Sequence, residues 1–170
     1  MSTTLDTRER AYRDARRTDA ARRYVVAHGA LREILGALVA ADPATLRYKH
    51  TCAVCGSHEH GRPELAGIAG APSFSLSHSG DVAVVAVSTE QVGADVEVVR
   101  ARRYLDRIAQ RTLRADEYSR WESLRDDEQV AAFLRSWTAK EAYLKMLGVG
   151  LTRALREIPT HDAQTWLDWP

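Results

Sequence analysis

The sequence has no excess of charge, no long apolar run and only two cysteines. Its 24 Lys and Arg residues balance 23 Asp and Glu residues, for a formal net charge of +1, which makes no case for a protein dedicated to nucleic acid. No stretch is apolar for long enough to span a membrane. Because Thr3 to Arg23 is polar and charged, Met1 does not lead into a signal peptide, and we expect a cytoplasmic protein.

Both cysteines lie in one short loop, which reads KHTCAVCGSHEHG at positions 49–61. The loop holds four side chains that can ligate zinc, namely Cys52, Cys55, His58 and His60. Structural zinc sites usually draw paired ligands from two separated segments, whereas these four follow one another directly. A reduced or redox-labile cysteine pair is the competing interpretation, and we rank zinc slightly below it.

A helical pattern near the C-terminus has a charged residue where an apolar one is expected. Its apolar residues, spaced by three and four, are Val130, Phe133, Leu134, Trp137, Leu144 and Leu147. The next position of this stripe after Trp137 is 141, which is Glu. A buried carboxylate needs a cation or dense hydrogen bonding. The alternative is an ordinary surface pair of Glu141 with Lys145, worth only about 0.3–0.5 kcal/mol.

A second acidic motif lies in QVGADVEVV at positions 91–99, where apolar and other residues alternate as in a half-buried strand. Asp95 and Glu97 would share one face of that strand, with Cα atoms about 6.5 Å apart. Two carboxylates so placed are tolerated on a solvated edge or around a divalent cation. Together with Glu141 they would suit a magnesium ion that also grips substrate phosphates.

These two motifs carry a family resemblance. VGADVE and WTAKEAYLKMLGVGL are similar to the two signatures of the Sfp-type 4′-phosphopantetheinyl transferases, and the spacing between them also suits that family. GRP at positions 61–63 and APSFSLSHSG at positions 71–80 resemble two further family elements, with Ser75 where Asn is usual. The resemblance covers about Arg8 to Leu151.

The resemblance implies an activity. Members transfer the phosphopantetheine arm of coenzyme A to a serine of an acyl or peptidyl carrier protein, using Mg²⁺ and releasing 3′,5′-ADP. Asp95, Glu97 and Glu141 would then be the metal ligands, and Glu141 could also take the proton of the carrier serine. Lys140 and Lys145 would add cationic stabilisation, although Lys140 lies about 100° round the helix from Glu141 and could face water.

The resemblance also implies which residues bind coenzyme A. Basic residues of the arginine-rich stretch from Leu5 to Arg23, with Arg17 and Arg23 as our candidates, would lie near the 3′-phosphate, because the guanidinium fork suits phosphate oxygens. A solvated helix face is the plainer interpretation of that stretch. The remaining candidates are Arg62, Ser77, His78 and Lys145, whose donors suit a pyrophosphate.

The fold implied by the resemblance is α+β. It has two similar sheet-plus-helix halves related by pseudo-twofold symmetry, residues 1–88 and 89–170, with the ligand cleft between them. Both ends look trimmed relative to the family. The local patterns predict a core helix over Tyr24–Ala40, a fully buried strand over Asp81–Ser88, helices over Tyr104–Leu113 and Ala115–Leu124, a long helix that begins at Asp126-Asp127 and ends at Gly148, and a short strand over Thr165–Trp169.

The expected partners are coenzyme A and a carrier protein. Arginines between the two signatures could attract an acidic carrier helix or could be ordinary surface charges; they are Arg102, Arg103, Arg107, Arg111 and Arg114. Two other functions stay open. One is a different magnesium-dependent phosphotransfer or phosphohydrolase enzyme that uses the same carboxylates, and the other is a catalytically weakened family member that binds coenzyme A or carrier protein.

Overall fold

The N-terminal stretch that the sequence predicted to be helix-compatible forms two helices. The computed structural model describes residues 4–16, 18–52, 54–59, 61–101, 103–150 and 154–158. Helix α1 spans Thr7–Asp14, and α2 spans Thr18–Val39. Asp6 caps α1 by accepting from the main chain of Glu9, whose side chain accepts in return from the main chain of Asp6. The predicted core helix is confirmed as the second part of α2.

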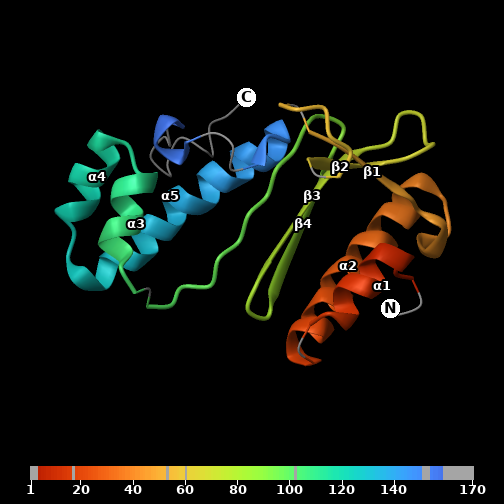
Figure 1. Cartoon of the computed structure of the whole chain (residues 1–170), viewed down its shortest axis with the longest axis horizontal. Coiled ribbons are helices and arrows are strands. Elements are labelled where there is room, and N and C mark those ends of the chain that lie inside the picture. The colour runs from red at the N-terminus through yellow and green to blue at the C-terminus, as the bar shows by residue number, and fades with distance from the viewer. Residues whose placement is uncertain are drawn as a thin grey trace.

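Two β-hairpins follow α2 and the short 3-10 helix η1 (Pro43–Thr45). The first pairs β1 (Tyr48–Thr51) with β2 (Arg62–Leu65), and the second pairs β3 (Ser73–Ser79) with β4 (Val82–Ser88). Figure 1 shows the second hairpin between α2 and α5. The sequence predicted the second hairpin, whereas β1 and β2 were missed because their four-residue strands flank the Cys/His loop.

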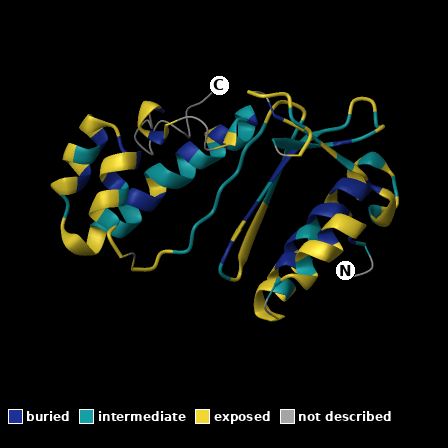
Figure 2. Cartoon of the chain, in the orientation of Figure 1, coloured by how far each residue is buried: buried dark blue, intermediate teal, exposed yellow. Residues whose placement is uncertain are grey.

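The prediction of a fully buried strand over Asp81–Ser88 was wrong in its burial. The strand forms, but Val82 and Val84 are 47% and 37% exposed, and this part of β4 is yellow in Figure 2. Within the described residues β4 pairs with β3 alone, so it is an edge strand there. An unbroken apolar run therefore does not establish burial on both faces of a strand.

The second half of the chain is helical in its described part. Helices α3 (Leu105–Thr112), α4 (Ala115–Glu122) and α5 (Asp126–Leu147) confirm the predicted helices, and η3 spans Leu155–Glu157. Gly148 ends α5 in the left-handed conformation, with φ of 70°. Asp116 lies in the first turn of α4 instead of capping it. The strand predicted over Thr165–Trp169 lies outside the described residues.

The apolar core is divided along the chain. One cluster joins α2 to the hairpins through Leu31, Leu35, Leu46, Leu65 and Phe74. Another joins α3, α4 and α5 through Ala109, Leu113, Trp121, Phe133 and Leu134. The α+β class is confirmed, but two similar halves are not, because both sheets of the described chain come from residues 48–88. No helix among the described residues is long and apolar enough to cross a membrane.

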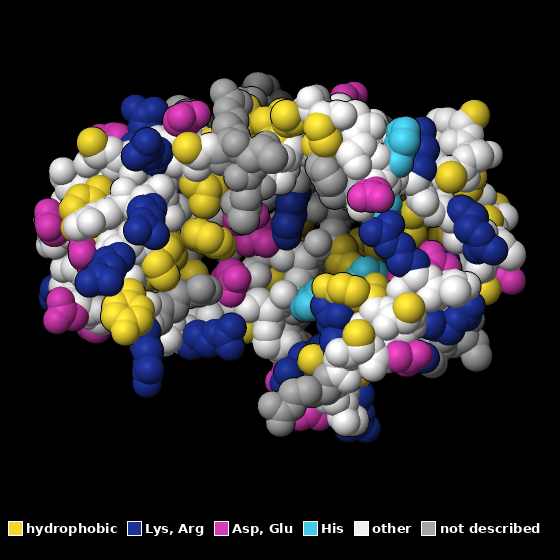
Figure 3. All heavy atoms as spheres, in the orientation of Figure 1, with side chains coloured by type: hydrophobic (Ala, Val, Ile, Leu, Met, Phe, Trp, Pro, Cys, Tyr) yellow, Lys and Arg dark blue, Asp and Glu magenta, His cyan; other side chains and the backbone are white. Residues whose placement is uncertain are grey.

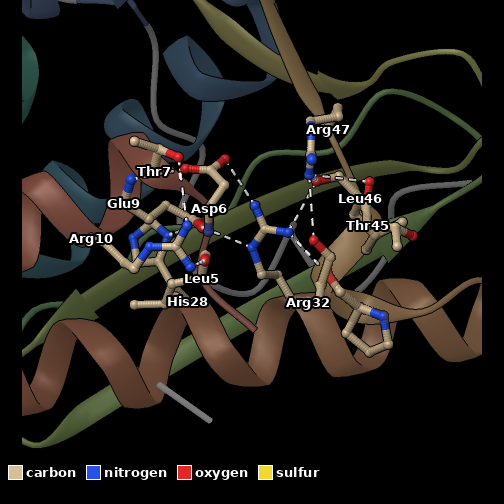
Figure 4. A network of polar contacts seen from close by, with 12 residues as sticks. Leu5, Asp6, Thr7, Glu9, Arg10, His28, Arg32, Thr45, Leu46 and Arg47 are labelled. Atoms are coloured by element: carbon tan, nitrogen blue, oxygen red, sulfur yellow. Dashed lines mark hydrogen bonds and ion pairs between the residues drawn. The ribbon is translucent and has the colours of Figure 1, made fainter. Parts of the chain in front are cut away.

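A buried arginine ties the N-terminal elements together. Arg32 of α2 is fully buried and donates from Nε to Glu9 (2.7 Å) and from Nη2 to Asp6 (2.9 Å). Its Nη1 donates to the carbonyl oxygens of Pro43 and Leu46. Figure 4 shows this guanidinium between the cap of α1 and the main chain that leads into β1. Such a cluster is structural, because each charge has an opposite charge or an acceptor.

Candidate active site

The acidic segment at positions 91–99 is extended but is not a strand of either sheet. It runs between the β3–β4 hairpin and α5 (Figure 1). Its main-chain N–H groups donate to serine hydroxyls of β3 instead of to main-chain carbonyls. On its other side Gly93 touches α5 so closely that a Cβ atom would lie 1.9 Å from the carbonyl oxygen of Ala142. The predicted half-buried strand is therefore corrected to an extended segment held by side chains.

This segment and α5 bring the candidate metal ligands near one another. Burial raises the pKa of Glu141, and the negative charges of Asp95 and Glu97 raise it further, while Lys145 opposes them. Oε1 of Glu141 is buried and has no hydrogen-bond partner among the described residues. The ordinary surface pair with Lys145 is thus not what the structure shows for Glu141, because Lys145 instead pairs with Asp95.

Asp95 accepts two hydrogen bonds on one of its oxygens. Its Oδ1 accepts from Nζ of Lys145 at 2.6 Å and from the hydroxyl of Ser77 at 2.7 Å. The side chain of Asp95 is 9% exposed and that of Lys145 is 33% exposed. Because both contacts fall on one oxygen, the lysine fixes the orientation of the carboxylate while its own ammonium group remains accessible to a ligand.

The donor set fits a hard divalent cation. Three carboxylates supply the oxygen ligands that Mg²⁺ prefers, and the buried, unpaired Oε1 of Glu141 is an acceptor that a cation would satisfy. As they stand, the described residues contain no group of three or more His, Cys, Asp or Glu side chains placed to hold a metal. Asp95 and Glu97 instead accept hydrogen bonds from Ser77 and Ser79.

A cavity of about 620 Å³ is lined by Lys145, the partner of Asp95, whereas the three carboxylates themselves do not line it. Its wall comes from α1, α2, the first three strands and the end of α5, and its basic and imidazole members are Arg8, His28, His50, Arg62, His78 and Lys145. Figure 3 shows basic, acidic and histidine side chains around the hollow between the two sides of the molecule. Such a wall suits a polyanionic ligand, because its cations lie next to a site that can add a metal charge.

Arg62 and His78, two of the predicted cofactor residues, line this cavity. Arg62 donates to the carbonyl oxygen of Met146 at 3.1 Å and to Glu64 at 3.0 Å, so it joins β2 to the end of α5. Partial burial and the nearby charges of His28, Arg16 and Lys145 lower the pKa of His78. This lowered pKa favours the neutral imidazole.

The structure separates other predicted residues from the cavity. Ser77 does not line it, and its hydroxyl is bonded to Asp95. Arg23 pairs with Asp81 at 2.7 Å, at the turn of the β3–β4 hairpin. Arg17 lies outside the described residues.

Lys140 differs most from its predicted role. Its side chain is fully buried and donates to Glu117 and to the carbonyl oxygen of Thr112. Lys140 therefore neither faces water nor reaches the acidic cluster of Asp95, Glu97 and Glu141. Burial lowers the pKa of Lys140 despite the favourable effect of Glu117. In this arrangement Lys140 ties α5 to α3 and α4, so we do not carry it into the proposed site.

The Cys/His loop gives the zinc interpretation no support. Cys52 is buried, Cys55 is exposed, and neither forms a disulfide. His58 directs Nδ1 at the carbonyl oxygen of His50, 3.0 Å away, and His60 lies outside the described residues. In the described ranges no metal-binding group of His, Cys, Asp or Glu is found. Main-chain N–H groups of Cys55 and Val54 lower the pKa of Cys52, as in a loop that holds a reduced pair.

Three residues of the cavity wall were missed from the sequence. Tyr48 and His50 come from β1, a strand that was not predicted, so their position had no signal. The sequence did carry a signal for His28, because this residue lies one helical turn from Tyr24 and from Arg32 on α2. Its ring stacks on Tyr24 with centroids 3.9 Å apart, and its Nδ1 lies 3.3 Å from Glu9.

Comparison with known proteins agrees with the motifs. Residues 91–167 match the model of the 4′-phosphopantetheinyl transferase superfamily. The chain is 37% identical over 152 residues to the 4′-phosphopantetheinyl transferase HetI of Nostoc sp., covering 84% of this chain and 60% of that protein. It is 42% identical over 92 residues to the 4′-phosphopantetheinyl transferase AcpT of Salmonella typhimurium, covering 53% of this chain and 47% of that protein.

The resemblance stated from the sequence is therefore confirmed: the chain carries a domain of the 4′-phosphopantetheinyl transferase superfamily. A third relative, the transferase psf-1 of Bacillus pumilus, is 38% identical over 101 residues, covering 57% of this chain and 42% of psf-1. The chain thus spans 42% to 60% of the length of these relatives.

Proposed function

We propose that this chain transfers the 4′-phosphopantetheine moiety of coenzyme A to a serine of an apo acyl or peptidyl carrier protein, releasing 3′,5′-ADP. The observation that carries the proposal is the position of Glu141, a half-buried carboxylate with an unpaired oxygen near Asp95, whose partner Lys145 lines the cavity. The relatives reported above are named 4′-phosphopantetheinyl transferases, which supports transfer of this moiety. The cytoplasmic location and the division into residues 1–88 and 89–170 stay predictions.

In this proposal the acidic cluster would hold magnesium. Asp95, Glu97 and Glu141 would be its protein ligands, and the ion, when bound, neutralises negative charge on the pyrophosphate and on the leaving 3′,5′-ADP. Lys145 already lies against Asp95 and would direct its exposed ammonium group at a phosphate oxygen. By family resemblance, Glu141 would accept the proton of the carrier serine.

The cavity would bind the nucleotide part of coenzyme A. Arg62 is held at the junction of β2 and α5 and can offer its remaining N–H groups to a phosphate. His78 would donate from its ring to the pyrophosphate, and a bound anion would raise its pKa again. Arg8, which lines the same cavity, replaces Arg17 and Arg23 as our candidate for the 3′-phosphate.

The direct test is intact-mass analysis of a purified apo carrier protein after incubation with the chain, coenzyme A and Mg²⁺. We expect the added mass of one phosphopantetheine group and an equal amount of 3′,5′-ADP. Release of 3′,5′-ADP without carrier protein would favour a magnesium-dependent phosphohydrolase instead. Binding of coenzyme A without transfer would indicate the weakened family member.

A further inference from the structure

Four serines of β3 form a regular ladder with the acidic segment. The hydroxyl oxygens of Ser73, Ser75, Ser77 and Ser79 accept from the main-chain N–H groups of Val92, Ala94, Val96 and Val98, at 3.3, 3.0, 3.2 and 3.2 Å. Each pair is separated by the same 19 positions, so the segment runs parallel to β3. Side-chain hydroxyls thus satisfy the N–H groups that carbonyl oxygens would satisfy in a sheet.

Two of these serines also donate to the predicted metal ligands. The hydroxyl of Ser77 donates to Oδ1 of Asp95 at 2.7 Å, and that of Ser79 donates to Oε2 of Glu97 at 2.9 Å. A hydroxyl has one proton and two lone pairs. In this arrangement both protons are committed to carboxylates, and a phosphate oxygen, which only accepts, can receive no hydrogen bond from either serine.

The opposite side of the segment is fixed by α5. A Cβ atom on Gly93 would lie 1.9 Å from the carbonyl oxygen of Ala142 and 2.6 Å from the nitrogen of Met146. The serines are themselves buried, with Ser77 and Ser79 only 7% and 8% exposed. The segment therefore has little freedom to shift toward α5 or away from β3.

We propose that Ser77 and Ser79 are positioning residues, which fix the orientation of the carboxylates of Asp95 and Glu97 through these hydrogen bonds. Ser73 and Ser75 hold only the main chain of the segment. This assignment rests on the proposed function, since it takes the two carboxylates to be metal ligands. It also replaces the earlier prediction that Ser77 binds coenzyme A directly.

The assignment predicts how each serine responds to substitution. Ser77→Ala removes the hydrogen bond to Asp95 and leaves the N–H of Val96 without its acceptor. Removing a group that orients a metal ligand typically weakens metal binding by about 10- to 100-fold. Ser77→Thr keeps the hydroxyl on a strand residue that tolerates β-branching, so it should restore most of that loss. Ser88→Ala, at the end of β4, is the matched control.

The experiment measures three quantities on the full chain and its variants. The first is amide hydrogen exchange of Val96 without any ligand, which should be about 2- to 10-fold faster in Ser77→Ala, the factor of one lost hydrogen bond. The second is Mn²⁺ binding by electron paramagnetic resonance, which should weaken in Ser77→Ala and Ser79→Ala. The third is turnover, where kcat should fall at limiting Mg²⁺ while the KM for coenzyme A changes little.

The outcomes test the positioning role of the serines separately from the metal site of the proposed function. Unchanged exchange at Val96 and unchanged Mn²⁺ affinity, together with a raised KM for coenzyme A, would make Ser77 a cofactor ligand and overturn the positioning role. A wild-type chain that binds no Mn²⁺ would overturn the metal site of the proposed function. Should Ser77→Ala not fold, Ser79→Ala carries the same measurements, with amide exchange followed at Val98, whose N–H donates to Ser79.

Discussion

The protein buries charged side chains in two places that differ in how the charges are compensated. Around Arg32, one guanidinium is surrounded by Asp6, Glu9 and two carbonyl oxygens, and it lies 4.8 Å from the ring centre of Tyr48. Around Glu141, burial and neighbouring carboxylates raise the pKa, and one oxygen lacks a hydrogen bond within the described part of the chain. The charge of Arg32 is matched within the protein, although the hydroxyl of Tyr48 is also buried without a hydrogen bond in the described part of the chain. The cluster around Glu141, in contrast, would be completed by a cation.

The contrast also separates two lysines of one helix. Lys140 and Lys145 both belong to α5 and both pair with a carboxylate, yet Lys140 is fully buried and Lys145 is 33% exposed. Lys140 has its ammonium group enclosed between α3 and α4, where no substrate can reach it. Lys145 lines the cavity. The role of a lysine therefore depends on the surroundings of its charged atoms and not on its position in a sequence motif.

The largest expected effect comes from removing a metal ligand. Asp95→Ala and Glu97→Ala should each lower magnesium-dependent transfer by orders of magnitude, because each removes a negative charge that holds the ion. Turnover at limiting and saturating Mg²⁺ measures this, with circular dichroism as the control for folding. Wild-type turnover at limiting Mg²⁺ in either variant would exclude that residue as a ligand.

A large loss of stability is expected from breaking the buried pair of Lys140. Lys140→Ala removes the buried ion pair of Lys140 with Glu117, which should lower the free energy of unfolding by about 3–5 kcal/mol. The double variant Lys140→Met/Glu117→Leu should recover most of that loss. Chemical denaturation measures both, and Arg120→Ala on the exposed side of α4 is the control. A Lys140→Ala protein of normal stability but no activity would return Lys140 to the catalytic set.

A pH-dependent effect is expected at the Arg32 cluster. Burial alone would raise the pKa of Glu9, but hydrogen bonds from His28, the main chain of Asp6 and Arg32 hold it below its usual value. A carboxyl whose pKa is lowered by folding contributes stability above its unfolded pKa, about 4.3, and loses it as pH falls through the folded value. Melting temperatures below pH 4.5 should thus fall less steeply in Glu9→Gln than in the wild type.

The smallest effect is expected at Arg23. Its guanidinium pairs with Asp81 on the surface and does not line the cavity, so Arg23→Ala should leave the KM for coenzyme A nearly unchanged. Arg8→Ala should raise that KM, because Arg8 lies on the cavity wall. Steady-state kinetics of the two variants, measured side by side, decide between them. A raised KM in Arg23→Ala alone would restore the original prediction.

The sequence predicted the helices well, because a helix depends on local order. The apolar stripe and Gly148 located α5, and the odd placement of Glu141 in that stripe pointed to its unusual surroundings. What could not be predicted depends on distant contacts. The pairing of Lys140 with Glu117 joins residues 23 positions apart, and β1 and β2 are too short to show a pattern.

The serine ladder lies between these cases. Serines at alternate positions of β3 and the alternation in VGADVE are both visible in the sequence. Their partnership depends on the segment lying parallel to β3 at a fixed offset, which no local pattern gives. A strand was expected at positions 91–99 because alternation signals a half-buried extended chain, and it cannot tell main-chain partners from side-chain hydroxyls.

The central claim is that Glu141, whose Oε1 is buried without a hydrogen-bond partner among the described residues, serves to bind a metal and not to stabilise the fold. The measurement is Glu141→Gln, followed by turnover and thermal unfolding with and without Mg²⁺. We predict a loss of activity by orders of magnitude, a melting temperature without Mg²⁺ that is unchanged or higher, and no further rise on adding Mg²⁺. Near-normal transfer, or a marked drop in melting temperature without Mg²⁺, would contradict the claim.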